Sequence, residues 1–198
     1  MELKNLNKIK DLPDDYMEDS LIDSITLEGY YDYLEINNSY IKSCDFSKVN
    51  FQGVDISNST FDNTNISNVD FSEHSYKKVI FNNCSLVGIN FTDSFLENVE
   101  FNECNLKYSN FSGTHIKNVT FNDCLLDDAS FIEVKWNKLI FNNCSMDSIE
   151  FYNTKLNKLD LSNCDISNIR ISINELKGLI VNSEQAISLA TILGIIIK

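Results

Sequence analysis

The sequence has very few of the residues that usually form loops. Its 198 residues include one proline, Pro13, and six glycines. Proline and glycine are the strongest local markers of turns and loops. We therefore expect few loops of the usual composition, in a chain long enough for one sizeable domain or a short array of repeats.

No secretory leader or membrane segment is visible in the sequence either. The N-terminal stretch from Met1 to Asp19 contains no apolar core of the kind that a signal peptide has. The longest apolar run, residues 187–197, is too short to span a bilayer. We expect a cytoplasmic protein that does not contact a membrane.

Positive charge is scarce. The chain holds 16 Lys and Arg against 29 Asp and Glu, a formal net charge of −13. Such a charge disfavours direct binding to nucleic acid or to an anionic membrane, and it permits binding to a basic protein surface. The hydrophobic content of 43% is that of a folded protein.

A repeat with a period of five dominates what is present. Twelve of the 13 phenylalanines lie at positions that end in 1 or 6, and Phe95 alone is out of register. Every fifth residue from Ile36 to Val181 is apolar. The motif FNNC or a close variant recurs at a constant interval, at 81–84, 101–104, 121–124 and 141–144. Repeats of this kind decide the fold class.

A period of five fits neither a helix nor a strand. Five residues advance an α-helix by about 500°, so the apolar positions would wander around its axis. On a strand an odd period alternates between the two faces. The pattern is buried consistently only if the chain turns a corner every five residues. Four corners make a square coil of 20 residues, and residues 36–181 make about 7.5 coils stacked about 4.8 Å apart.

The other positions of the pentad agree with this coil. The residue two before each apolar centre is small or β-branched, as a narrow interior requires. The remaining three are rich in polar residues, as an outer surface requires. Asparagine recurs at 82, 102, 122 and 142, where we expect side-chain ladders between coils.

The pentads resemble those of pentapeptide-repeat proteins, whose consensus is roughly Ala/Cys-Asp/Asn-Leu/Phe-x-x. Matching units are CDFSK at 44–48, CNLKY at 104–108, ASFIE at 129–133 and CDISN at 164–168. This resemblance implies an all-β fold, a right-handed quadrilateral parallel β-helix, over residues 36–181.

A repeat array that ends on a short apolar helix also resembles the Qnr subfamily. That resemblance implies a non-enzymatic, DNA-mimicking homodimer that binds DNA gyrase or topoisomerase IV. Such a protein protects the enzyme from quinolones and thereby confers antibiotic resistance. The register runs from 36 to 181 without the projecting loops of proteobacterial Qnr proteins, so the chain is similar to a loopless Gram-positive type. The alternative is a structural or interaction solenoid with an unrelated protein partner.

Both ends of the array need covers, because a solenoid exposes strand edges and open core there. We expect residues 1–35 to form an acidic N-terminal cap, partly helical or an irregular first coil. Residues 182–198 are expected to form a C-terminal helix with Ser183 as N-cap and Gly194 as its end. This helix caps its own monomer or joins two copies. The candidate dimer interface consists of Ile187, Leu189, Ala190, Ile192, Leu193, Ile195, Ile196 and Ile197.

Charge is distributed unevenly around the coil. Residues 36–181 hold 18 acidic and 12 basic residues, a net charge of −6, so imitation of DNA can only be local. Three faces carry five acidic residues each, whereas the fourth carries three acidic residues and eight lysines. Either the acidic faces bind a basic groove or all of this is ordinary solvated charge. The candidate topoisomerase-contacting residues are Asp62, Asp70, Glu73, Asp93, Glu100, Glu103, Asp123, Asp127, Asp128 and Glu133.

Nothing in the sequence indicates catalysis or a cofactor. No glycine-rich phosphate loop, H-E-x-x-H motif or recognised nucleophile motif occurs. His115 is at an outward position, and His74 takes the place of a small inward residue and should distort one corner. Tyr76 and Trp136 are expected in the core. The cysteines form either a metal or redox ladder or, as we favour, a buried column in a reducing compartment. They are Cys44, Cys84, Cys104, Cys124, Cys144 and Cys164.

Overall fold

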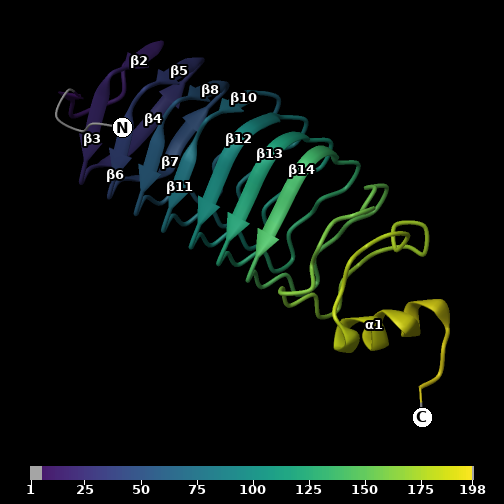
Figure 1. Ribbon diagram of the computed structural model, residues 1–198. Coiled ribbons are helices and arrows are strands. Elements are labelled where there is room, and N and C mark those ends of the chain that lie inside the picture. The colour runs from purple at the N-terminus through teal and green to yellow at the C-terminus, as the bar shows by residue number, and fades with distance from the viewer. Residues whose placement is uncertain (1–5, 198) are drawn as a thin grey trace.

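The chain forms a rod of stacked coils. The structure is a computed structural model that describes residues 6–197. The strands stack side by side along the rod, and the C-terminal helix lies at the end opposite to the N-terminus (Figure 1). The strands are β1 (Asn7–Lys8), β2 (Tyr16–Glu18), β3 (Ser20–Asp23), β4 (Thr26–Tyr31), β5 (Leu34–Asn37), β6 (Tyr40–Lys42), β7 (Asp45–Phe51), β8 (Val54–Ser57), β9 (Thr60–Asp62), β10 (Ser75–Lys77), β11 (Ile80–Asn82), β12 (Phe95–Asn102), β13 (His115–Asn122) and β14 (Lys135–Asn142).

All strand pairs are parallel, and their register confirms the predicted square coil. Phe81 pairs with Phe101, Phe101 with Phe121, and Phe121 with Phe141. Isolated bridges continue the same offset past the last strand, from Ser145 to Asp165 and beyond. The predicted fold class, an all-β parallel solenoid with a short C-terminal helix, is thereby confirmed.

The corners lie two positions after each apolar centre, in a left-handed backbone conformation. Positive φ recurs at positions that end in 3 or 8, for example Asn63 (53°), Asn83 (52°) and Gly113 (70°). Asparagine, aspartate and glycine tolerate this conformation best, and they occupy most of these positions. The turns therefore rely on asparagine and aspartate where glycine is scarce.

Phenylalanine rings fill the interior. The twelve phenylalanines in register are all buried, whereas Phe95 is 36% exposed. Rings one coil apart stack: the Phe101 and Phe121 centroids are 4.7 Å apart with an angle of 3° between the planes. Rings of opposite sides meet edge to face, as Phe111 and Phe121 do at 89°. Both geometries are favourable for aromatic pairs.

One column of the interior is made of cysteines, and all six are free and buried. Their thiols donate to backbone carbonyls, for example from Cys124 Sγ to Phe101 O at 3.4 Å and to Asn122 O at 3.3 Å. No group of ligands that could hold a metal ion occurs among residues 6–197. This arrangement favours the buried structural column over a metal ladder.

His74 changes the coil locally. Its ring lies over Gly53, where an added Cβ would come within 2.6 Å of Nε2, so the glycine makes room for the imidazole. His74 Nδ1 lies 3.5 Å from Asp55 Oδ1, and the Ser75 N–H donates to the Asp55 carboxylate at 2.8 Å. The pairing of β8 with β10 starts only at Tyr76. The predicted distortion is thus confined to one corner.

The segment before residue 35 is an irregular coil, and no helix occurs in its described part. β2 pairs with β5 and β3 with β6 at an offset of 19, as in Tyr16↔Glu35, and a bulge in β4 restores the offset of 20. Its buried residues Leu12, Met17, Ile22 and Leu27 keep the spacing of five. The boundary at residue 35 as a division between functional units stays a prediction.

A short helix closes the other end. α1 (Ser183–Ala190) is followed by the 3-10 helix η2 (Thr191–Leu193), and Gly194 ends it with φ of 74°, as predicted. The N-cap is Asn182 and not Ser183, because the extended Asn182 forms a reciprocal capping box with Gln185. No helix among the described residues is long and apolar enough to cross a bilayer.

We predict that Phe101→Ala lowers the free energy of unfolding by about 3–5 kcal/mol, because it removes a fully buried ring from two stacks. Urea denaturation followed by circular dichroism measures this. Phe95→Ala is the matched control, because it removes the same side-chain atoms from a ring that is exposed. It should lower the free energy of unfolding by about 1 kcal/mol or less. Equal costs at both positions would contradict the stacked core.

We also predict that the protein loses stability at alkaline pH. A hydrogen bond with the neighbouring cysteine and burial raise the pKa of Cys124 and Cys144 from 9.0 to about 12. Between these values the unfolded chain binds fewer protons, so this stability is complete below about pH 9 and is lost as pH rises toward 12. Thermal melts under reducing conditions should show a falling Tm. In Cys124→Ala/Cys144→Ala the decline should be shallower, and an unchanged slope would contradict the assignment.

Candidate functional site: the acidic corners and the C-terminal cap

The predicted acidic residues gather at the corners of the rod. Six of the ten occupy left-handed corner positions with φ between 52° and 61°. These are Glu73, Asp93, Glu103, Asp123, Asp128 and Glu133. A corner points away from the rod, and its position repeats in each coil about 4.8 Å further along. The corners therefore present carboxylates in rows parallel to the rod axis.

One part of the acidic surface is neutralised within the molecule. Lys107 Nζ lies 2.8 Å from Asp127 Oδ2, and Ser145 Oγ donates to the same carboxylate at 2.5 Å. Burial acts to raise the pKa of Asp127, but these contacts lower it below its usual value. Arg170 joins Asp128 at 2.7 Å and Glu150 at 2.8 Å. Asp127 and Asp128 are therefore poor candidates for contact with a basic partner.

Other acidic residues accept hydrogen bonds from neutral donors and not from cations. Asp62 accepts from Tyr40 Oη at 2.8 Å, Asp70 from Asn90 Nδ2 at 2.9 Å, and Asp123 from Asn143 Nδ2 at 2.6 Å. These bonds fix the orientation of the carboxylates without neutralising them.

Four carboxylates are open. Glu73, Asp93, Glu100 and Glu103 have no side-chain hydrogen bond or ion pair within the part of the chain that the structure describes, and all four are exposed. Asp93 Oδ1 lies over Gly113, where an added Cβ would come within 2.0 Å of it. Three of them occupy corners, and Glu100 lies within β12. These four residues, which we call the open acidic corners, are the strongest candidates for an external contact.

The asparagine column is a ladder, as predicted. Asn102 donates to Asn82 at 2.9 Å, Asn122 to Asn102 at 2.7 Å, and Asn142 to Asn122 at 2.7 Å. Each amide is used along the ladder, so this column stabilises the stack between the acidic corners.

The lysine-rich face contains a departure from the predicted core. Tyr76 is fully buried and donates to Phe71 O at 2.9 Å, as expected of a core residue. Trp136 is only partly buried, and its indole Nε1 donates to Lys155 O at 2.7 Å on the outside. The expectation that Trp136 lies wholly in the core was wrong, because its ring is larger than the Ile116 and Leu156 side chains of the same column.

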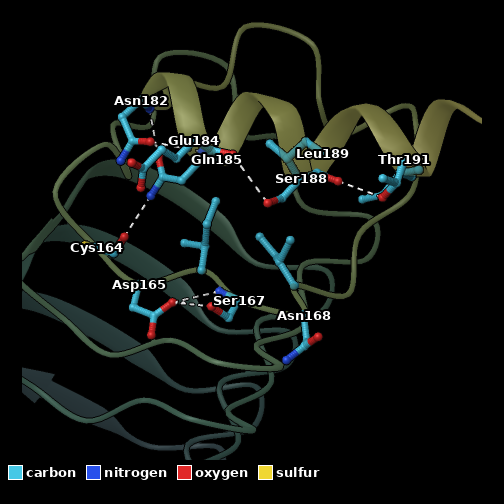
Figure 2. A pocket seen from close by; sticks show the side chains of 13 residues that line it. Cys164, Asp165, Ser167, Asn168, Asn182, Glu184, Gln185, Ser188, Leu189 and Thr191 are labelled. Carbon is cyan, nitrogen blue, oxygen red and sulfur yellow. Dashed lines mark hydrogen bonds between the residues drawn. The ribbon is translucent and has the colours of Figure 1, made fainter. Parts of the chain in front are cut away.

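The C-terminal helix covers the last coil. Figure 2 shows Gln185 reaching from α1 to Cys164; its Nε2 donates to Cys164 O at 2.7 Å and to Leu161 O at 2.9 Å. Leu189 is 8% exposed and packs against the same coil. A cavity of about 770 Å³ remains between α1 and residues 164–169. The helix therefore satisfies carbonyl groups that the end of the solenoid would leave open.

The predicted dimer interface divides into two parts. Leu189 and Ile192 pack against the core of their own chain, and Ala190 is partly buried. The others form an exposed apolar patch, which we call the C-terminal patch. Its residues and their exposures are Ile187 (55%), Leu193 (50%), Ile195 (51%), Ile196 (85%) and Ile197 (51%).

Comparison with known families agrees with the fold. Residues 34–111 match the model described as pentapeptide repeat region, and residues 103–171 match the model described as SV2A/B/C luminal domain. No curated protein matches the chain.

Solved structures that resemble the chain include full-length QnrB1, described as a plasmid-mediated fluoroquinolone resistance protein. It shares 21% identity at a TM-score of 0.46, over 89% of this chain and 100% of that one. A pentapeptide repeat protein from the Arabidopsis thaliana thylakoid lumen shares 17% identity at a TM-score of 0.37, over 69% and 74% of the two chains.

The coils that follow the matched segment have the same repeat as the coils within it. The same offset between coils continues beyond residue 111, through β13 and β14 and the bridge from Asp160 to Ile180. Residues 34–111 thus match a pentapeptide repeat region, and the same repeat continues in the coils that follow it.

Proposed function

We propose that the rod is a non-enzymatic protein that binds a type II topoisomerase, DNA gyrase or topoisomerase IV, and protects it from quinolones. The open acidic corners are the observation that carries this proposal. Exposed carboxylates in rows are suited to a basic groove that normally holds phosphates, because both groups accept charge-assisted hydrogen bonds from arginine and lysine.

The mimicry in this proposal is local. Duplex DNA carries one charge per about 1.7 Å of its axis, whereas a row of corners offers at most one carboxylate per coil of about 4.8 Å. Glu103 and Asp123 follow each other in one row, and Glu73 and Asp93 in another. Contact would therefore involve short acidic segments, with the lysine-rich face turned away from the groove.

The proposed protein is a homodimer joined through the C-terminal patch. Ile196, at 85% exposure, and its neighbours form an apolar surface that one helix cannot cover by itself. A two-fold partner that presents the same patch would bury it. The repeats of two copies would then extend over about 70 Å, comparable to roughly 20 base pairs.

A second candidate is an interaction solenoid with a different protein partner. The ion pairs of Asp127 with Lys107 and of Asp128 with Arg170 favour it, because they reduce the acidic surface available to a basic groove. The continuous register without projecting loops favours it as well.

We predict that the protein restores gyrase supercoiling in the presence of ciprofloxacin. The triple variant Glu73→Gln/Asp93→Asn/Glu103→Gln should lose most of this effect, because it removes open carboxylates without changing side-chain size. Lys77→Gln/Lys78→Gln, on the lysine-rich face, is the control and should protect as the wild type does. If the wild type gives no protection below the concentration at which it inhibits gyrase, the quinolone role fails and the second candidate remains.

We predict a dimer mass by light scattering at tens of micromolar protein. Ile196→Glu should give a monomer, because it places a charge in the middle of the C-terminal patch. Leu125→Glu, at a position 41% exposed in the middle of the rod, should leave the mass unchanged. A wild-type monomer would show that the helix only caps its own chain.

A further inference from the structure

The ladder of strands on the lysine-rich face ends with β14, the strand that contains Trp136. β13 pairs with β14 at Ile116↔Trp136, but within the described chain no strand or bridge continues from β14 to residues 155–157 of the next coil. Two side chains make the connection instead. The Trp136 indole donates to Lys155 O at 2.7 Å, and Thr154 Oγ1 accepts from the Val134 N–H at 3.0 Å.

A hollow lies at this interruption. It has a volume of about 890 Å³, within the usual range for sites that bind small molecules. Its lining includes Trp136, Lys135, Lys138, Lys155 and His115, with Asp93 and Glu133 also present in the lining. The indole N–H bond fixes the ring, so the hollow has a rigid aromatic element beside three ammonium groups.

In the absence of a ligand, the lysines around the hollow repel one another. Lys135 and Lys155 are one coil apart at the same position, as are Lys138 and Lys158. Like charges that lie directly opposite each other on neighbouring strands are destabilising, and the same repulsion acts between neighbouring coils. None of the four takes part in an ion pair within residues 6–197, whereas Lys117 on the same face pairs with Glu97 at 2.5 Å.

Two of these lysines also occupy left-handed corners. Lys138 has φ of 62° and Lys158 has φ of 71°. Other coils have Asn58, Asn98, Asn118 and Gly178 at this corner, and asparagine and glycine adopt the conformation more readily. Lys78 also occupies this corner with φ of 54°, but it has asparagine and not lysine one coil away on either side. Backbone conformation and charge both disfavour lysine at these positions, and an anionic ligand would explain why lysine is present.

We propose that this hollow binds a nucleoside diphosphate or triphosphate. The base would stack on the indole of Trp136, since base stacking on aromatic side chains is favourable for every base. The phosphates would lie between Lys135, Lys138 and Lys155, whose ammonium groups bind phosphate as point charges. A small ligand is favoured over a nucleic-acid strand, because the net charge of −13 repels a long polyanion.

Trp136 is the only tryptophan of the sequence, so its fluorescence reports on the hollow directly. Titration of the full-length protein with ADP or ATP should change the emission saturably below about 1 mM. Lys135→Gln/Lys155→Gln should weaken binding by about tenfold or more and leave the circular dichroism spectrum unchanged. Lys77→Gln/Lys78→Gln removes the same charge from the same face and should change the affinity less than about twofold.

Competition experiments decide the class of ligand. Inorganic tripolyphosphate should compete with ATP but bind more weakly, because it lacks the base. Equal affinity for tripolyphosphate, equal weakening by both double variants, or no saturable change in fluorescence would each overturn the proposal. Tighter binding of a thymidine oligonucleotide or of a poly-glutamate peptide would overturn it in favour of a nucleic acid or an acidic protein segment.

Discussion

The stacking of each residue on its counterpart in the next coil is the interaction on which the rest of the structure depends. Backbone hydrogen bonds between coils and the aromatic stacks of the interior both require this constant offset. The offset in turn requires a corner in every pentad, and the corners require a backbone that tolerates positive φ. A single pentad could not bury its own phenylalanine, so stability arises from contacts between neighbouring coils.

Stacking also places equivalent positions of successive coils in a column along the rod, so that a residue type that recurs at one position forms a row of identical side chains. A column of asparagines becomes a hydrogen-bonded ladder, and a column of cysteines becomes a buried row of thiols with raised pKa. A column of like charges becomes a row whose members repel. The rod tolerates the acidic rows because they lie at exposed corners and are interrupted by asparagine and glycine. Other acidic residues form ion pairs between coils, as Asp128 does with Arg170 two coils away.

The sequence predicted the coil because the signal repeats thirty times without an insertion, from Ile36 to Val181. It left open whether the segment before residue 35 is partly helical or an irregular coil, because the offset there is 19 and the apolar positions from Leu27 back are displaced by one from the series that starts at Ile36. The corner column was visible as recurrent asparagine and aspartate, but residue type alone does not show which of the outer positions makes the turn. Asn182 was missed as N-cap because Ser183 is an equally good capping residue by type, and only backbone geometry distinguishes them.

The candidate sites were less predictable, because they depend on which charges meet in space. Sequence position identified the acidic faces, but it could not show that Lys107 and Arg170 neutralise Asp127 and Asp128 while Glu73, Asp93, Glu100 and Glu103 remain open. It likewise placed Trp136 in the core, because an apolar residue at a centre position is normally buried. The ring is too large for that place.

Residues that break the repeat fall into two kinds. His74 is accommodated by Gly53 in the coil below, and the ladder resumes at Tyr76. Trp136 has no such glycine opposite it: the ladder ends with its strand, and a hollow lined by unpaired lysines lies beside the indole. Local consistency is what makes a repeat sequence specify its fold, and departures from it that are not compensated tend to mark functional positions. On this reasoning the lysine-rich face is more than the inert back of an acidic rod, and a ligand bound there would lie beside Asp93, one of the open acidic corners.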